Sequence, residues 1–112
     1  MTTIMTDTPN MKRYRRSRKD YPIGVIGIYD NNGKSMDRYT VCYTPIESQG
    51  ETWWPYLGMS EHPYHPQGFG QHGELRFRKT RQRGERCINF AELPPDCQKL
   101  VMSDLKGATL CT

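Results

Sequence analysis

The sequence predicts a small α+β domain: an antiparallel sheet of about four to five strands with one C-terminal helix, preceded by a disordered basic N-terminal tail. Aromatic and β-branched segments separated by turn residues predict the sheet, and one amphipathic stripe near the end predicts the helix. Residues 1–20 have almost no apolar periodicity, which is typical of disorder. The 112 residues therefore divide into a tail, 1–20, and a single domain, 21–112.

The first two strands should form a hairpin. Residues 21–29 are rich in β-branched side chains, and Gly24 or Gly27 could form a bulge there. Asn32-Gly33 lies between two apolar runs, and both residues tolerate a positive φ, which is a strong hairpin signal. Residues 38–44 then alternate between apolar and polar, so we expect a second strand with one face toward the core.

The middle of the chain predicts one strand between two loops. Residues 46–52 are polar and are expected to form a loop, and residues 53–59 predict a third strand that Pro55 interrupts or places at an edge. Residues 60–73 contain prolines, glycines and all three histidines, which excludes a helix and indicates a long, shaped loop. Two aromatic residues in that loop predict that it is ordered and packed.

A second hairpin is expected after this loop. Residues 74–78 alternate, with Leu75 and Phe77 predicted to point inward, and residues 79–84 form a basic turn. Residues 85–90 complete the hairpin as a fifth strand. The helix should begin at residues 93–96, where proline and aspartate favour a first turn, and end at Gly107. Its apolar stripe consists of Cys97, Leu100, Val101 and Leu105.

Basic residues are concentrated in two segments, which suggests a polyanionic partner. The tail carries Lys12, Arg13, Arg15, Arg16, Arg18 and Lys19. The predicted second hairpin carries Arg76, Arg78, Lys79, Arg81, Arg83 and Arg86. These residues could grip phosphates while an exposed Trp53, Trp54 or Tyr64 stacks on bases. The alternative is a charged tail and a solvated hairpin, with the aromatic residues in the core.

The histidines and cysteines do not predict a metal site or a cofactor. His62, His65 and His72 are spaced as H-x2-H-x6-H, but two intervening prolines limit how the first two rings can converge. The cysteines are widely spaced, so we expect reduced thiols, with Cys42, Cys87 and Cys97 in the core.

A small hydrolase is a further hypothesis. Asp37 and Arg38 precede the second strand, and Glu61 and His62 follow the third, so these groups could meet at one sheet edge, with His65 nearby. The alternative is a turn salt bridge between Asp37 and Arg38, with Glu61 capping loop amides. No established catalytic signature is present in the sequence.

Three segments resemble a group of small uncharacterised proteins found in bacteriophages and other bacterial mobile elements. They are Y-D-N-N-G-K-S-M-D-R-Y-T-V at 29–41, M-S-E-H-P-Y-H-P-Q-G-F-G-Q at 59–71 and L-P-P-D-C-Q-K-L-V at 93–101. The resemblance implies a setting, the cytoplasm of a bacterial host cell, but no mechanism and no site. The sequence itself contains no signal peptide pattern and no apolar run of membrane-spanning length, so no membrane partner is expected.

The leading functional hypothesis is a small non-catalytic binding protein of a phage or mobile element. It would act on nucleic acid, or on a host nucleic-acid machine, for example as an inhibitor, through its basic patches. The alternatives are the small hydrolase described above and a structural or assembly protein without a small ligand.

Overall fold

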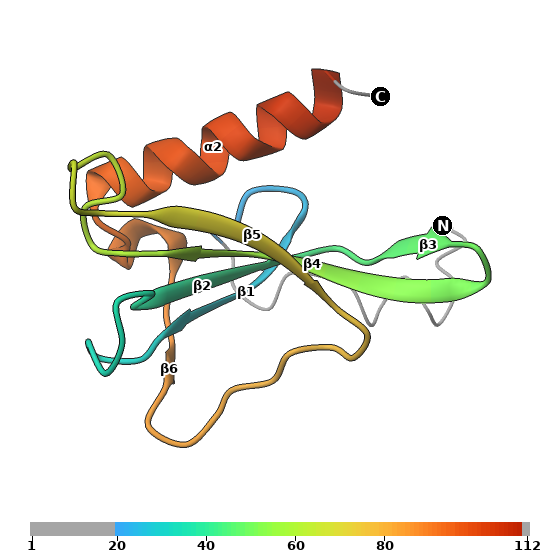
Figure 1. Ribbon diagram of the computed structural model, residues 1–112, viewed down its shortest axis with the longest axis horizontal. Coiled ribbons are helices and arrows are strands. Elements are labelled where there is room, and N and C mark those ends of the chain that lie inside the picture. Colours follow the sequence, from blue (N-terminus) through green and yellow to red (C-terminus); the bar gives the residue numbers. More distant parts are fainter. Residues whose placement is uncertain (1–19, 111–112) are drawn as a thin grey trace.

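The computed structural model describes residues 20–110, with side chains described for residues 20–107, and consists of one antiparallel sheet and one long helix (Figure 1). The α+β class is confirmed, with six strands in the sheet. The predicted tail, including Lys12, Arg13, Arg15 and Arg16, lies outside the described residues, apart from Asp20. The elements are β1 (Val25–Asp30), β2 (Tyr39–Tyr43), β3 (Ile46–Ser48), β4 (Glu51–Met59), β5 (Gly70–Leu75), β6 (Arg86–Cys87), a 3-10 helix (Phe90–Glu92) and α2 (Pro95–Leu110).

Strand β4 is the centre of the sheet. It pairs with β2 and then β3 along one side and with β5 along the other. On the far side of β2 lies β1, and β6 pairs with β1 at that edge. Strands β5 and β6, which are consecutive in the sequence, therefore lie at opposite edges of the sheet.

The β1–β2 hairpin forms as predicted. Its register pairs Ile28 with Val41, and an irregularity between Val25 and Gly27 confirms the predicted bulge. In the connecting loop, Asn32-Gly33 has φ values of 63° and 83°, the left-handed conformation that these two residue types tolerate.

The prediction of a polar loop at 46–52 is wrong, because these residues form a second hairpin. Strand β3 pairs with the start of β4, and the turn between them has φ values of 53° at Gln49 and 79° at Gly50. Polar side chains are compatible with a strand here because this hairpin projects past the helix and is mostly exposed. Pro55 does not interrupt β4. On this side of β4 the pairing with β3 ends at Trp53 and the pairing with β2 begins at Tyr56, so Pro55 lies between the two.

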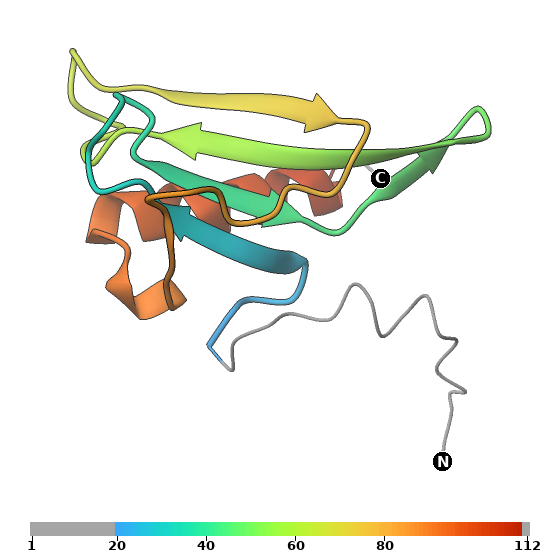
Figure 2. The same ribbon diagram turned by 90° about the horizontal axis from the view of Figure 1, so that it is seen from below.

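The predicted hairpin between residues 74–78 and 85–90 is also wrong. Strand β5 begins at Gly70, inside the predicted histidine loop, and ends at Leu75. It pairs with β4, whereas β6 pairs with β1 at the opposite edge. Residues 76–85, called here the crossing loop, run between the two edges across the face of the sheet that the helix leaves uncovered (Figure 2). Neither Leu75, which is 38% exposed, nor Phe77, which is 81% exposed, points into the core.

The main core lies between the sheet and α2. Cys97 and Val101 of the predicted stripe are fully buried, and Leu100 and Leu105 pack against the same cluster. The helix continues through Gly107 to Leu110, so the predicted end at Gly107 is wrong. The predicted burial of Cys87 is also wrong, since this residue is exposed on the edge strand β6. In the part of the chain that the structure describes, no helix has both the length and the apolar character needed to cross a membrane.

Candidate functional site

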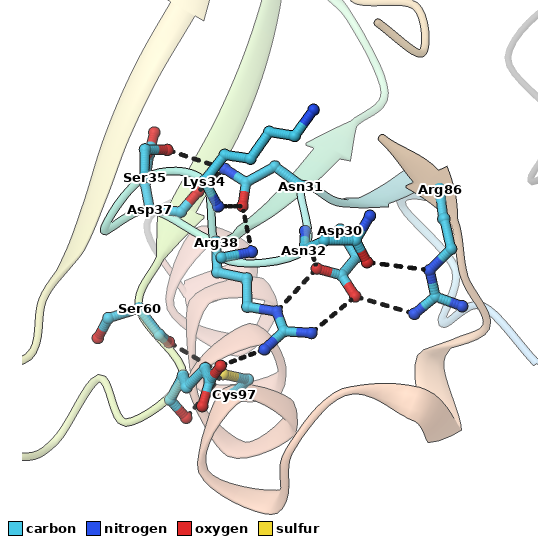
Figure 3. Close-up of polar contacts among 12 residues, drawn as sticks. Asp30, Asn31, Asn32, Lys34, Ser35, Asp37, Arg38, Ser60, Arg86 and Cys97 are labelled. Atoms are coloured by element: carbon cyan, nitrogen blue, oxygen red, sulfur yellow. Dashed lines mark hydrogen bonds and ion pairs between the residues drawn. The ribbon is translucent and has the colours of Figure 1, made fainter. Parts of the chain in front are cut away.

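A buried carboxylate, Asp30, organises the polar residues at one end of the sheet (Figure 3). Asp30 is only 2% exposed, and its Oδ1 accepts hydrogen bonds from Arg38 Nε at 2.8 Å and from the backbone N–H of Asn32 at 2.8 Å. Its Oδ2 accepts from Arg86 Nη2 at 3.0 Å. The guanidinium of Arg38 also forms an ion pair with Glu61. One carboxylate thus joins the β1–β2 loop, the segment after β4 and the start of β6.

These contacts fix the charge states of the cluster. Burial alone would raise the pKa of Asp30, but the hydrogen bonds from Arg38, Asn32 and Arg86 outweigh burial and hold this pKa below its ordinary value. Hydrogen bonds to Asp30 and Glu61 raise the pKa of Arg38. The cluster contains two carboxylates and two guanidiniums, so its formal charge is neutral and it leaves no excess charge for a ligand.

Only some of the groups proposed for acid–base chemistry come together in the structure. Arg38 and Glu61 come together as expected, but their partner is Asp30 and not Asp37. Asp37 lies on the exposed loop, where its carboxylate accepts a hydrogen bond from Ser35 Oγ at 2.6 Å. Glu61, the proposed carboxylate, is engaged by a guanidinium, which is the arrangement of a structural ion pair. The hydrolase hypothesis stays a prediction that no contact in this cluster favours.

Sequence reasoning missed Asp30, although the sequence contained a usable signal. Asp30 lies two residues after Ile28 on a β-strand, and residues with this spacing face the same side of a sheet. An acidic residue on the core face requires a basic partner. Arg38, which follows the hairpin loop, was the basic residue closest in sequence to the second strand and could have been assigned to that role.

The histidine loop is ordered by its own turns, but the three histidines do not converge. Backbone bonds from His65 N to His62 O (3.0 Å) and from Gly68 N to His65 O (2.8 Å) form two consecutive turns. A Cβ at Gly68 would collide with the carbonyl oxygen of His62, so only glycine fits there. Tyr64 remains 55% exposed, whereas Phe69 is partly buried, so the predicted packing applies to one of the two aromatic residues.

His62 and His65 line a shallow cavity of about 270 Å³ together with Glu61. His72 lies elsewhere, on β5, where its Nε2 is 2.5 Å from Asp104 Oδ1 on α2. Among residues 20–107, no group of three or more histidine, cysteine, aspartate or glutamate side chains is arranged to hold a metal ion.

Several contacts hold the crossing loop against the sheet. Lys79 and Glu85 form an ion pair of 2.9 Å in which both side chains are largely buried. The Lys79 ammonium lies 4.7 Å from the centroid of the Tyr29 ring, and the Tyr29 hydroxyl donates to the carbonyl of Lys79 at 3.4 Å. Burial raises the pKa of Tyr29 to about 12, so this hydroxyl keeps its proton near neutral pH. Gln82 N adds a hydrogen bond of 2.9 Å to Glu85.

The six basic residues predicted to form one patch divide into two groups. Three of them have acidic partners: Arg76 pairs with Glu51 and stacks on Trp53, while Lys79 and Arg86 pair as described above. The other three, Arg78, Arg81 and Arg83, are exposed and form no ion pair with any residue in the described range. Lys34 lies against Gly84 and adds a further exposed cation beside them. In the part of the chain that the structure describes, the arginines without an ion pair therefore all lie on the crossing loop.

The same loop exposes an aromatic side chain. Phe77, at 81% exposed, lies between the stacked Arg76 and the unpaired Arg78. Trp53 and Trp54 are partly buried in β4 and are less accessible to a ligand than Phe77. Sequence alternation had placed Phe77 in the core, so this exposed ring could be found only from the strand pairing.

Comparisons of the chain with known protein families, with curated proteins and with solved structures found no match.

Proposed function

We propose that this chain is a non-catalytic binding protein whose ligand is single-stranded nucleic acid and whose binding surface is the crossing loop, in the setting of a phage or mobile element. The observation that carries the proposal is the grouping of three exposed arginines, Arg78, Arg81 and Arg83, on one loop, with no acidic partner among residues 20–107. Guanidinium groups bind phosphate through paired hydrogen bonds, and the phosphate backbone supplies most of the affinity of such complexes.

The attachment of the loop supports this proposal. A segment that is already fixed by the Lys79–Glu85 pair and the Tyr29 ring loses less conformational entropy on binding than a free segment would. Because its exposed arginines belong to a tethered loop, phosphate contacts would require little further ordering of the backbone.

Phe77 supports a single strand over a duplex. An exposed ring among basic residues is the combination by which proteins hold unpaired bases, and each base stacked on an aromatic ring contributes roughly 1–3 kcal/mol. In a duplex the bases are already stacked on each other, so Phe77 would have no equivalent role.

Gel-shift titrations at low salt with single-stranded DNA, single-stranded RNA and duplex DNA test this function. Replacing Arg81 and Arg83 by alanine should weaken single-strand binding by about tenfold or more, since two phosphate contacts are lost. The matched control replaces Lys99 and Lys106, two exposed lysines on α2, which removes the same charge from the other face of the sheet.

The control variant should bind like the unmodified protein. Equal losses in both variants would show that only net charge matters and would contradict a site on the crossing loop. Failure of all three nucleic acids to bind would mean that the loop faces an acidic protein partner instead.

A further inference from the structure

Strand β5 has the longest free edge of any strand in the part of the chain that the structure describes. All six residues of β5 pair with β4 in one regular register, and among residues 20–110 no strand pairs with its other side. Figure 2 shows β5 as the outermost strand on its side of the sheet, with α2 behind the neighbouring strands. The other edge strands are shorter, with three residues in β3 and two in β6. A free edge leaves the backbone N–H and C=O groups of alternate residues without a strand partner.

The sequence of β5, G-Q-H-G-E-L, has none of the features with which proteins usually block a strand edge. It contains no proline, lysine or arginine, and its register with β4 shows no bulge. Every residue of the strand except Gly73 is exposed. An edge of this kind can accept a further strand through backbone hydrogen bonds.

An aromatic ring from β4 reaches over β5 on the face that the crossing loop covers. A Cβ at Gly73 would lie 2.4 Å from both Cζ and Oη of Tyr56, so the tip of this ring lies over the glycine. Facing Cα atoms of an antiparallel pair are about 4.5–5.5 Å apart. If Gly73 of a second copy lay opposite Gly73 of the first, the tips of the two Tyr56 rings would lie side by side and could pack together.

The charges on β5 are complementary to those of a second β5 strand. His72 and Glu74 are two residues apart and therefore share one face of the strand, the face toward α2, where His72 contacts Asp104. When Gly73 faces Gly73, each His72 lies opposite Glu74 of the other copy, and cross-strand pairs of opposite charge are stabilising. A pairing centred on His72 or on Glu74 would instead place two imidazoles or two carboxylates opposite each other.

We propose that this chain forms a two-fold symmetric dimer in which the β5 strands of two copies pair antiparallel, with Gly73 opposite Gly73. His72 keeps its Nε2 contact with Asp104, and Nδ1 of the same ring, in the imidazolium form, donates to Glu74 of the second copy. The two-fold axis is perpendicular to the sheet, so both helices lie on one side of a continuous sheet and both crossing loops lie on the other. A single strand pair buries less surface than a standard protein interface, so we expect a dissociation constant of about 10–500 µM.

The oligomeric state is measured by sedimentation velocity from about 10 µM to 1 mM protein, without nucleic acid. The measurement is made at pH 6.0, where more imidazole is protonated than at pH 8. The unmodified protein should change from monomer to dimer across this range. Glu74→Lys should weaken the dimer by at least about tenfold, because both cross-strand pairs then have like charges. The matched control, Glu47→Lys, makes the same charge change on the exposed edge strand β3 and should dimerise like the unmodified protein.

Cross-linking tests the register. Gln71→Cys and Leu75→Cys are prepared as two separate proteins, each also carrying Cys87→Ser and Cys111→Ser. In the proposed register, residue 71 of one copy faces residue 75 of the other at a Cα distance that a disulfide can span, whereas two residues 71 or two residues 75 are at least about 13 Å apart. Oxidation of the mixture should therefore give a disulfide-linked dimer on a non-reducing gel, and oxidation of either protein alone should give little.

The proposal is overturned if the unmodified protein stays monomeric at about 1 mM, if Glu74→Lys dimerises as tightly as Glu47→Lys, or if either cysteine variant alone cross-links as readily as the mixture. The dimer is measured without nucleic acid and goes beyond the proposed function. Failure of the dimer would therefore leave the crossing loop as the proposed binding surface, and failure of nucleic-acid binding would leave the dimer.

Discussion

At the scale of single residues, Asp30 stabilises this fold by joining segments that are distant in the sequence. A buried carboxylate is costly unless charged or polar donors surround it, and Arg38, Arg86 and the Asn32 amide meet that requirement. Arg86 begins β6, so the same contacts also fix the end of the crossing loop. The position of the crossing loop, the proposed binding surface, therefore depends on a residue that is itself almost inaccessible to solvent.

Replacing Asp30 by asparagine should lower the free energy of unfolding at pH 7 by about 3 kcal/mol, the low end of the range for breaking a buried ion pair, because both guanidiniums are partly exposed. The pKa of Asp30 is depressed in the folded state, so its stabilising contribution is present above the ordinary value of 3.8 and is lost as the pH falls through the folded pKa. Urea denaturation at pH 7 and at pH 3 should show the difference between the two proteins shrinking at the lower pH.

Asp37→Asn is the matched control, because Asp37 is an exposed neighbour whose carboxylate accepts a hydrogen bond from the Ser35 hydroxyl. It should change the free energy of unfolding by no more than about 0.5 kcal/mol. An equal loss in both variants, or a difference that is the same at pH 7 and pH 3, would contradict the assigned role of Asp30.

The cysteines provide a second residue-scale prediction. Burial raises the pKa of Cys42 and of Cys97 to about 12, so neither forms appreciable thiolate at pH 8, whereas Cys87 is exposed. In a Cys111→Ser background, an alkylating reagent at pH 8 should modify Cys87 first and the other two only after denaturation. Mass spectrometry of the modified peptides gives the order in which the cysteines react. If Cys42 or Cys97 reacted as fast as Cys87, the result would be inconsistent with their burial.

At the scale of elements, the β3–β4 hairpin is held by a turn with two left-handed residues. Gly50 has φ of 79° and open space around its Cα, so alanine there meets no clash but adopts a strained backbone. Gly50→Ala should therefore lower the free energy of unfolding by about 1–2 kcal/mol.

Gln49→Asn makes the reverse comparison, because asparagine tolerates the left-handed φ of 53° at that position better than glutamine does. Its thermal midpoint should equal or exceed that of the unmodified protein. A lower midpoint for Gln49→Asn, or no change in Gly50→Ala, would show that the turn does not have this conformation.

The elements that could be predicted from sequence have strong local signals. Asn32-Gly33 identified the first hairpin, and the stripe at Cys97 and Val101 identified the helix face. Strand β5 has no such signal: G-Q-H-G-E-L contains no β-branched residue and is a strand because β4 lies beside it. Its Gly73 leaves the space that the Tyr56 ring occupies, a requirement that only the paired structure reveals.

The candidate site, too, could be predicted only in part from local sequence patterns. The concentration of basic residues near 76–86 was visible in the sequence, but which of them are neutralised depends on contacts with Glu51, Glu85 and Asp30. Two of these three acids lie at least 25 positions away along the chain, so local patterns carry no information about them. The exposure of Phe77 likewise follows from β5 ending at Leu75, which alternation could not indicate.

At the scale of the whole molecule, the two faces of the sheet have different coverings. Helix α2 buries one face, and the crossing loop passes over the other, so the sheet lies between the helix and the loop (Figures 1 and 2). The proposed binding surface on the crossing loop therefore lies on the opposite side of the sheet from the helix.

The most direct test of the central proposal is the salt dependence of single-strand binding. Fluorescence anisotropy of a labelled single-stranded oligonucleotide, titrated at several salt concentrations, gives the slope of log affinity against log salt. Replacing Arg78, Arg81 and Arg83 by alanine should flatten that slope by about 2, since each phosphate contact on a single strand contributes about 0.7. An unchanged slope in this variant, with binding retained, would place the phosphate contacts elsewhere and contradict the crossing loop as the binding surface.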